Sequence, residues 1–201
     1  SALEAYLSLG YFLAPQTIYR NVYKLLPGHW LHARAGEVKI AQYWDVTEFD
    51  TDDRPPEQLL GEIDATLRQA VHERLESEVP LGAFLSGGID SGLVVSYMAE
   101  ALGDRLVTAT RGFGDAAHNE LEAAGLTAAH FHSQHHASTL EPELSEVIEP
   151  VTSHLGEPLA DSSAIPTWYV SREARKHVTV ALTGDGGDES WAGYDFRYVP
   201  D

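Results

Sequence analysis

The feature that most constrains the fold is an alternation of short apolar segments with helical segments beyond residue 79. The segments at 79–86 (VPLGAFLS), 105–113 (RLVTATRGF) and 177–184 (HVTVALTG) are short and apolar, which predicts strands. Strands that alternate with helices of about ten residues or more form a parallel sheet covered on both faces. The sequence therefore predicts an α/β fold, a parallel twisted sheet with helices on both sides.

The intervals between these strands carry apolar residues at helical spacing. The expected helices cover residues 93–102, 118–131, 142–155 and 163–175. The third of these is expected to break or end near Pro150, because proline removes a helix hydrogen bond. A further amphipathic helix is expected between residues 59 and 75, ahead of the first strand.

The chain changes character near residue 50. Two alternating stretches, 22–32 and 38–44, flank the segment ARAGE and predict a β-hairpin with its turn at Gly36. The acidic, proline-bearing segment 50–56 is typical of a linker. We therefore expect a small β-rich part ahead of the α/β part.

Charge and cysteine content exclude several classes of function. The 31 acidic residues outnumber the 13 basic ones, for a formal net charge of −18, which disfavours nucleic-acid and anionic-membrane partners. The chain has no cysteine, and this excludes disulfides and cysteine nucleophiles within it. No apolar run reaches the ~18 residues of a membrane span, so we expect a soluble, cytoplasmic protein.

Two glycine-rich turns follow predicted strands, SGGIDS at 86–91 and TGDGGDES at 183–190. Ligands of parallel sheets bind beyond the carboxyl ends of the strands, so both turns are expected at the binding edge. A strand that runs through Ser-Gly-Gly into a helix presents backbone N–H groups to an anion. Ser86 and Ser91 add hydroxyl donors. Neither common nucleotide fingerprint fits, because no lysine follows the glycines and G-x-G-x-x-G is absent.

Asp90 decides between two interpretations of the first turn. A carboxylate inside a phosphate-binding loop repels the ligand unless a divalent cation lies between them. The alternative is an ordinary strand–helix turn with a helix cap. A second aspartate in the other turn, Asp188, favours the phosphate-and-metal interpretation.

The two turns also carry a resemblance to a known family. LSGGIDS (85–91) resembles the pyrophosphate-binding loop of ATP pyrophosphatases, and ALTGDGGDESWAGYDFRY (181–198) is similar to the second signature of glutamine-hydrolysing asparagine synthetases. LLPGHWL (25–31) and QYW (42–44) resemble the end of that family's glutaminase domain. The resemblance implies a glutaminase remnant with linker over 1–50 and a synthetase domain, truncated at its C-terminus, over 51–201.

The resemblance also implies a reaction and its residues. It implies an ATP- and Mg²⁺-dependent ligase of asparagine biosynthesis, in which a carboxylate is adenylated and ammonia from glutamine then displaces AMP. Asp90 and Asp188 correspond to the family's metal-binding aspartates, and Asp185 to an acidic residue near the attacking amine, a candidate proton acceptor. A homodimer is one expectation for the full-length form. The nucleotide-binding residues implied by the resemblance are Leu85, Ser86, Gly87, Gly88, Asp90, Ser91, Arg111, Thr183 and Gly184.

Departures from the family pattern leave other functions open. Arg111 stands where the family usually has a small aliphatic residue whose backbone contacts adenine, so the guanidinium would crowd the base or stack on it. The family's cysteine nucleophile and a downstream lysine are absent from this sequence. The alternatives are therefore amidation of another carboxylate, or nucleotide binding without catalysis.

Two further groups of residues have a competing interpretation. His130, His132 and His136 have the even spacing of one strand face, but zinc ligands usually come from separate elements, so metal binding is disfavoured. Asp161 precedes a predicted helix, where it serves as an N-cap beside two serines or lines the substrate pocket. Trp191 is expected to be a core or interface aromatic rather than a stacking platform.

Overall fold

The computed structural model describes residues 2–47, 51–113, 120–140, 144–191 and 193–194. The chain forms two compact units, Ser1–Pro55 with Leu144–Ala164 and Pro56–Glu143 with Ile165–Asp201. Among the helices of these described ranges, none is long and apolar enough to cross a membrane.

A four-stranded parallel sheet organises the second unit. Its strands are β3 (Leu81–Phe84), β4 (Val107–Phe113), β5 (Gln134–Leu140) and β6 (Val180–Leu182), in the spatial order β5-β4-β3-β6. In the register of the central strand, Ala83 pairs with Thr108 of β4 on one side and Leu182 of β6 on the other. The prediction of a parallel sheet is confirmed.

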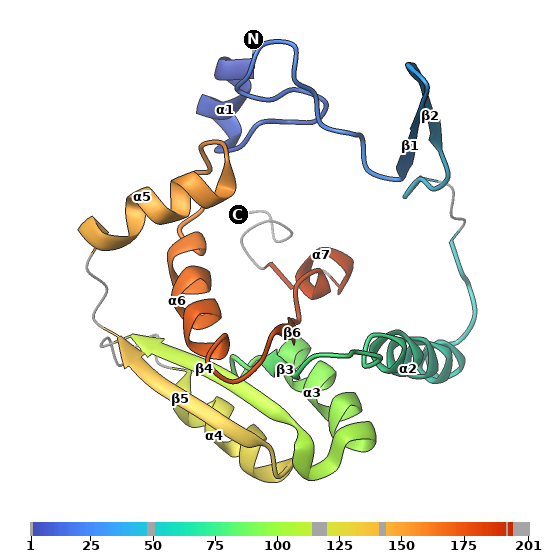
Figure 1. The fold of residues 1–201 in the computed structure, drawn as a ribbon. Coiled ribbons are helices and arrows are strands. Elements are labelled where there is room, and N and C mark those ends of the chain that lie inside the picture. The colour runs from blue at the N-terminus through green and yellow to red at the C-terminus, as the bar shows by residue number, and fades with distance from the viewer. Residues whose placement is uncertain (1, 48–50, 114–119, 141–143, 192, 195–201) are drawn as a thin grey trace, which may run out of the picture. The chain divides into compact units, whose positions relative to one another are not determined.

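Helices cover both faces of this sheet (Figure 1). One face carries α3 (Ile89–Leu102) and α4 (Leu121–His130), with α2 (Pro56–Glu73) packed against α3. The other face carries α6 (Ala164–Ala174), which leads into β6. The connecting elements are the 3₁₀ helix Gly103–Arg105 and the short helix α7 (Gly187–Trp191).

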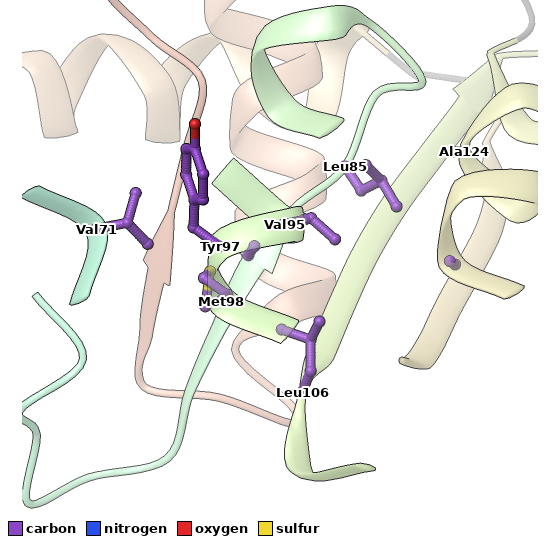
Figure 2. Packing of buried hydrophobic residues seen from close by; sticks show 9 residues of the cluster. Val71, Leu85, Val95, Tyr97, Met98, Leu106 and Ala124 are labelled. Atoms are coloured by element: carbon purple, nitrogen blue, oxygen red, sulfur yellow. The ribbon is translucent and has the colours of Figure 1, made fainter. Parts of the chain in front are cut away.

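The larger part of the core lies on the α3–α4 face (Figure 2). Leu85, Val95, Met98 and Leu106 are almost completely buried there, because strand, helix and the loop into β4 all direct apolar side chains inward. The cluster on the opposite face has fewer buried residues. The full α3–α4 cluster is Val71, Ala83, Leu85, Val95, Tyr97, Met98, Leu106, Ala124 and Ala128, and the α6 cluster is Ala109, Ala174 and Val178.

Polar contacts fix α2 against α3. The Tyr97 hydroxyl donates to Asp64 Oδ1 over 2.8 Å, and Arg68 donates to both Asp64 and Glu100. Hydrogen bonds from Arg68 and Tyr97 hold the pKa of Asp64 below its usual value. These contacts hold α3, whose first turn follows the sequence SGG, in a defined position.

Three predictions for the second unit need correction. Helix α3 begins at Ile89, four residues before the predicted start, because Gly88 serves as its N-cap in extended conformation. Strand β5 was not among the predicted strands; its polar sequence QHHASTL suits an edge strand that pairs with β4 alone. The three histidines share no strand face, since His130 ends α4, His132 lies in the turn with φ +53° and His136 lies in β5.

The first unit contains α1 (Ala2–Leu9), the antiparallel hairpin β1 (His29–Arg34) and β2 (Glu37–Gln42), and α5 (Leu144–Leu155). The predicted turn is confirmed: Ala35 and Gly36 both have positive φ, as a two-residue type I′ turn requires. The predicted strand over 22–28 is wrong. The hairpin starts only after Gly28, whose φ is +66° and whose carbonyl accepts from the Tyr43 amide over 2.8 Å.

Helix α5 also differs from its prediction, since it continues through Pro150 to Leu155. Val147 and Val151 flank the proline one turn apart, and both are buried. Burial of that apolar face offsets the hydrogen bond that the proline removes.

Candidate functional site

A cavity of about 820 Å³ opens at the carboxyl ends of the strands in the second unit. Both glycine-rich turns line it, because β3 and β6 are neighbouring parallel strands and end at the same edge. The predicted residues that line it are Leu85, Ser86, Gly88, Asp90, Ser91, Arg111, Thr183, Gly184, Asp185 and Asp188.

Hydrogen bonds inside the first turn fix its shape. The Ser86 amide donates to Ser91 Oγ over 3.2 Å, and the two serine hydroxyls lie 3.0 Å apart. The Gly88 amide donates to Ser86 Oγ over 3.2 Å, and Ser91 Oγ donates to the Gly88 carbonyl over 3.3 Å. Ser91 is buried. Its hydroxyl, expected as a donor to a ligand, thus mainly holds the turn together.

Gly87 differs from its neighbours, because it is not among the residues that line the cavity. Its φ is +87°, and a Cβ there would lie 2.7 Å from the Ala123 Cβ and 3.0 Å from the Ala124 amide nitrogen. The glycine therefore allows the turn to pack directly on α4. Its place in nucleotide binding stays a prediction.

The first turn ends at the N-terminus of α3, a helix of 14 residues. Its N-cap is Gly88, so no cap side chain accepts from the first-turn amides within the described structure. Free amides and the positive end of the helix dipole attract an anion. The structure thus presents an anion site at the edge of the cavity.

The second turn packs against the first through glycines. A Cβ on Gly184 would lie 2.7 Å from the Ser91 amide nitrogen, and one on Gly187 would lie 2.4 Å from Asp90 Cγ. The Asp90 carboxylate therefore lies beside the backbone of the residue that precedes Asp188. Both predicted metal-binding aspartates line the same cavity.

The cavity carries a strong excess of negative charge. Its walls hold the carboxylates of Asp90, Glu120, Asp185 and Asp188, whereas Arg111 is the one basic residue among the described lining residues. Four carboxylates repel a polyphosphate unless a divalent cation compensates them. Within the described ranges, no group of three or more His, Cys, Asp or Glu side chains could hold a metal ion. A pair of carboxylates fits Mg²⁺, which usually completes its shell with water and phosphate oxygens.

The residues expected near a base and ribose have backbone partners of their own. The Leu85 amide donates to the Ala109 carbonyl over 3.0 Å, and the Leu85 carbonyl accepts from the Thr110 hydroxyl. The Asp185 amide donates to Thr183 Oγ1 over 3.3 Å. These bonds order the apolar wall and the start of the second turn.

Sequence reasoning did not find the wall that α6 supplies. Pro166, Thr167 and Val170 line the cavity, and so does Glu120 before α4. The strand order brings α6 to this edge, and no local sequence signal encodes that order. Trp191 also lines the cavity and is 55% exposed, so it is not a core aromatic, and the interface role stays a prediction.

Asp161 lies before α6, in the first unit. Its Oδ1 accepts from the Ser163 amide over 2.8 Å, the bond of an aspartate at a helix-initiating turn. The predicted helix-cap role therefore agrees with its geometry, and a substrate role stays a prediction.

The sheet, its helices and its edge cavity define a protein of the adenine nucleotide alpha-hydrolase-like fold. Among solved structures, glutamine-dependent NAD⁺ synthetase from Acinetobacter baumannii, in complex with ADP, is similar over 79% of this chain and 32% of its own, with TM-score 0.50 and 20% identity. The asparagine synthase family model matches residues 62–201. The chain belongs to the asparagine synthase family.

Two curated relatives match nearly the whole chain. Asparagine synthetase [glutamine-hydrolyzing] 1 of Bacillus subtilis is 34% identical over 99% of this chain and 32% of its own length. Putative asparagine synthetase [glutamine-hydrolyzing] 2 of Methanocaldococcus jannaschii is 36% identical over 96% of this chain and 38% of its own length. The chain therefore spans about a third of the length of these relatives.

Proposed function

We propose that this chain is the ATP-binding part of an ATP-dependent amide-forming ligase of asparagine synthetase type. The observation that carries the proposal is the meeting of two glycine-rich turns at one sheet edge, with Asp90 against Gly187 and the α3 N-terminus beside them. Membership of the asparagine synthase family and its similarity to asparagine synthetase [glutamine-hydrolyzing] 1 of Bacillus subtilis support the same reaction class.

The proposed reaction has two steps. In the first, a carboxylate oxygen of the acceptor, aspartate, attacks the α-phosphorus of ATP. The bond to the β-phosphate oxygen breaks, and pyrophosphate leaves with the electron pair. In the second, ammonia attacks the carbonyl carbon of the acyl-adenylate, AMP leaves, and the nitrogen loses a proton to give the amide. Positioning and charge compensation supply most of the catalysis in transfers of this kind.

Each part of the cavity has a proposed role in these steps. The backbone amides at the uncapped start of α3, from Ile89 to Ser91, bind the departing pyrophosphate, and the wall at Leu85 and Thr183 contacts base and ribose. Asp90 and Asp188 hold Mg²⁺, which when bound neutralises charge on the phosphate oxygens. Asp185, exposed at the second turn, accepts the proton from the attacking amine.

Calorimetry with a non-hydrolysable ATP analogue tests the binding. The wild-type chain should bind the analogue more tightly with Mg²⁺ than without it, and Asp90→Asn and Asp188→Asn should lose that difference. Asp104→Asn is the matched control, because Asp104 lies in the 3₁₀ helix before β4, at the other end of the strand. Equal affinity and equal Mg²⁺ response in Asp90→Asn and wild type would contradict the metal site.

Pyrophosphate release tests the reaction and its acceptor. Release by the full-length protein, screened with aspartate and with other carboxylic acids, identifies the acceptor. If the protein binds ATP but releases no pyrophosphate with any of the acids, the function is nucleotide binding without catalysis. The absence of cysteine from this chain favours free ammonium as the nitrogen source for the chain itself. Glutamate release from glutamine by the purified chain would contradict this assignment.

A further inference from the structure

Arg111 lies at the end of β4, with its side chain on the face that α6 covers. Along a strand, alternate residues share a face, and Ala109 two positions earlier packs in the α6 cluster. The Arg111 side chain is only 9% exposed, although the residue lines the cavity. A cation so deeply buried requires compensation from its surroundings.

Among the residues that the structure describes, the partners that compensate it lie on α6. Nη1 of Arg111 lies 3.6 Å from Glu173 Oε2 and donates to the Tyr169 carbonyl over 3.4 Å. The guanidinium carbon also lies 5.2 Å from the centre of the Tyr169 ring. Its Nε is buried and has no partner within the described part of the chain.

The α6 partners are themselves well held. Tyr169 is 2% exposed, and Arg172 stacks on its ring with a separation of 4.9 Å. Glu173 accepts from Lys176 over 2.7 Å. That hydrogen bond, with the charges of Lys176, Arg111 and His177, holds the pKa of Glu173 below its usual value despite partial burial. Glu173 therefore stays ionised opposite Arg111.

These contacts matter because the buried apolar cluster under α6 is small. Within the described residues it consists of Ala109, Ala174 and Val178, with Phe84, Val107 and Ala181 partly buried against it, whereas nine buried residues form the cluster on the opposite face. The buried residues of α6 itself are Tyr169 and Ala174. Alanine buries little apolar area, so the Tyr169 ring, which Arg111 contacts, is the main buried side chain that docks the helix. Yet α6 supplies Pro166, Thr167 and Val170 to the cavity wall, and Val170 directly follows Tyr169.

We propose that Arg111 is a positioning residue, which through Tyr169 and Glu173 holds α6 as the nucleotide-facing wall of the cavity. Its charge is neutralised inside the wall, and its guanidinium is therefore not the group that contacts the ligand. The geometry also requires arginine: a planar fork can pair with a carboxylate, a carbonyl and a ring at once, and a lysine ammonium cannot. The effect on ATP affinity rests on the proposed function, whereas the contact that Arg111 makes between β4 and α6 does not.

The test compares Arg111→Lys, Glu173→Gln and the double variant with wild type. Arg175→Lys is the matched control, since Arg175 is an exposed cation just beyond α6 whose Nη1 donates to Thr179 Oγ1 and not to Tyr169 or Glu173. Three quantities are measured: amide hydrogen exchange of residues 164–174 without ligand, affinity for the ATP analogue with Mg²⁺, and affinity for pyrophosphate with Mg²⁺. Pyrophosphate reports on the first turn alone.

Both single variants should exchange faster across α6 and bind the ATP analogue roughly three- to tenfold more weakly, the scale of one ordinary hydrogen bond. The double variant should be no weaker than the worse single variant, because both remove one shared contact. Pyrophosphate affinity and the Arg175→Lys control should match wild type.

Three results would overturn the positioning role. One is unchanged α6 exchange in Arg111→Lys. The second is that Arg111→Lys binds ATP more weakly while Glu173→Gln binds it as tightly as wild type does, which would mean that the guanidinium contacts the base directly. The third is an equal loss for ATP and pyrophosphate, which would mean general damage to the fold. Failure of wild type to bind ATP would instead contradict the proposed function. The exchange measurement would still show whether Arg111 holds α6 against β4.

Discussion

The two glycine-rich turns of the cavity are built by different means. The first turn, Ser86–Ser91, has a network of hydrogen bonds among its own side chains and amides, and a 14-residue helix follows it. The second turn, residues 183–190, includes the start of the five-residue helix α7. Within it the Asp185 amide donates to Thr183 Oγ1, and the Gly187 and Ser190 amides donate to the carbonyls of Gly184 and Gly186. The first turn is thus shaped by its own sequence.

The second turn depends instead on close contact with the first. Its glycines at 184 and 187 approach Ser91 and Asp90 so closely that neither position has room for a Cβ. Glycines of the same cavity therefore have different structural roles. Those of the second turn set the spacing between Asp90 and Asp188, and hence the geometry of the proposed metal site.

The largest effect is expected for Gly187→Ala. The new Cβ would lie 2.4 Å from Asp90 Cγ, a separation that requires the aspartate or the turn to move. Because φ of Gly187 carries no strain for alanine, the effect isolates this contact. We expect Mg²⁺-dependent binding of the ATP analogue to fall by roughly a hundredfold, about 2.7 kcal/mol, measured by calorimetry.

Gly92→Ala is the matched control for that substitution. Gly92 is helical and has nothing within 4 Å of its Cβ position, so alanine should leave ATP affinity unchanged and raise the melting temperature slightly. If Gly187→Ala binds the analogue as wild type does, the second turn does not set the Asp90 position.

A smaller effect on binding, with a clear loss of stability, is expected for Gly87→Ala. Alanine there is strained at φ +87° and would contact Ala123 of α4 at 2.7 Å. The free energy of unfolding should fall by about 1–3 kcal/mol, the range for backbone strain of this kind, measured by denaturant titration.

The α4 contact can be separated from the backbone strain. Adding Ala123→Gly to Gly87→Ala removes the 2.7 Å contact and leaves the positive φ. The double variant should recover part of the loss, once the effect of Ala123→Gly alone is subtracted. No recovery would mean that backbone strain and the remaining 3.0 Å contact with the Ala124 amide nitrogen explain the effect.

Much of the fold could be predicted from the sequence, because local patterns encode its elements. Apolar periodicity predicted β3, β4, β6 and the helices α2 to α6, but not α1 or α7, and strand–helix alternation predicted the parallel sheet. Strand β5 was missed because QHHASTL is polar, as an edge strand can be. Pro150 was expected to end its helix, and only the burial of Val147 and Val151 explains why it does not.

The site was predictable to the extent that it lies in contiguous motifs. The residues of both turns could be identified from their glycines, aspartates and serines. Strand order and helix packing are properties of the whole sheet, so the wall at Pro166, Thr167 and Val170 was not visible in the sequence. The burial of Arg111 against Glu173, 62 positions along the chain from it, depends on the same topology.

The smallest effect is expected for Ser91→Ala, which tests whether the first turn is held by its hydroxyls. The substitution removes the acceptor of the Ser86 amide and the partner of the Ser86 hydroxyl. The Gly88 amide keeps its bond to Ser86 Oγ, so the turn should loosen rather than collapse. The bond from Ser91 Oγ to the Gly88 carbonyl is lost as well, which makes three bonds. Because these bonds hold the turn both with and without ligand, only about 1 kcal/mol, the contribution of one neutral hydrogen bond, should be lost from binding, which predicts roughly fivefold weaker binding of the ATP analogue.

Ser96→Ala is the matched control for Ser91→Ala, because Ser96 lies in the same helix and its hydroxyl donates to the Leu93 carbonyl over 2.7 Å, outside the turn. It should bind the analogue as wild type does. Pyrophosphate should lose affinity in Ser91→Ala to the same extent as ATP, since the first turn binds the phosphates of both. If Ser91→Ala binds both ligands normally, the glycine backbone alone shapes the first turn, and the two turns then differ less than their hydrogen bonds indicate.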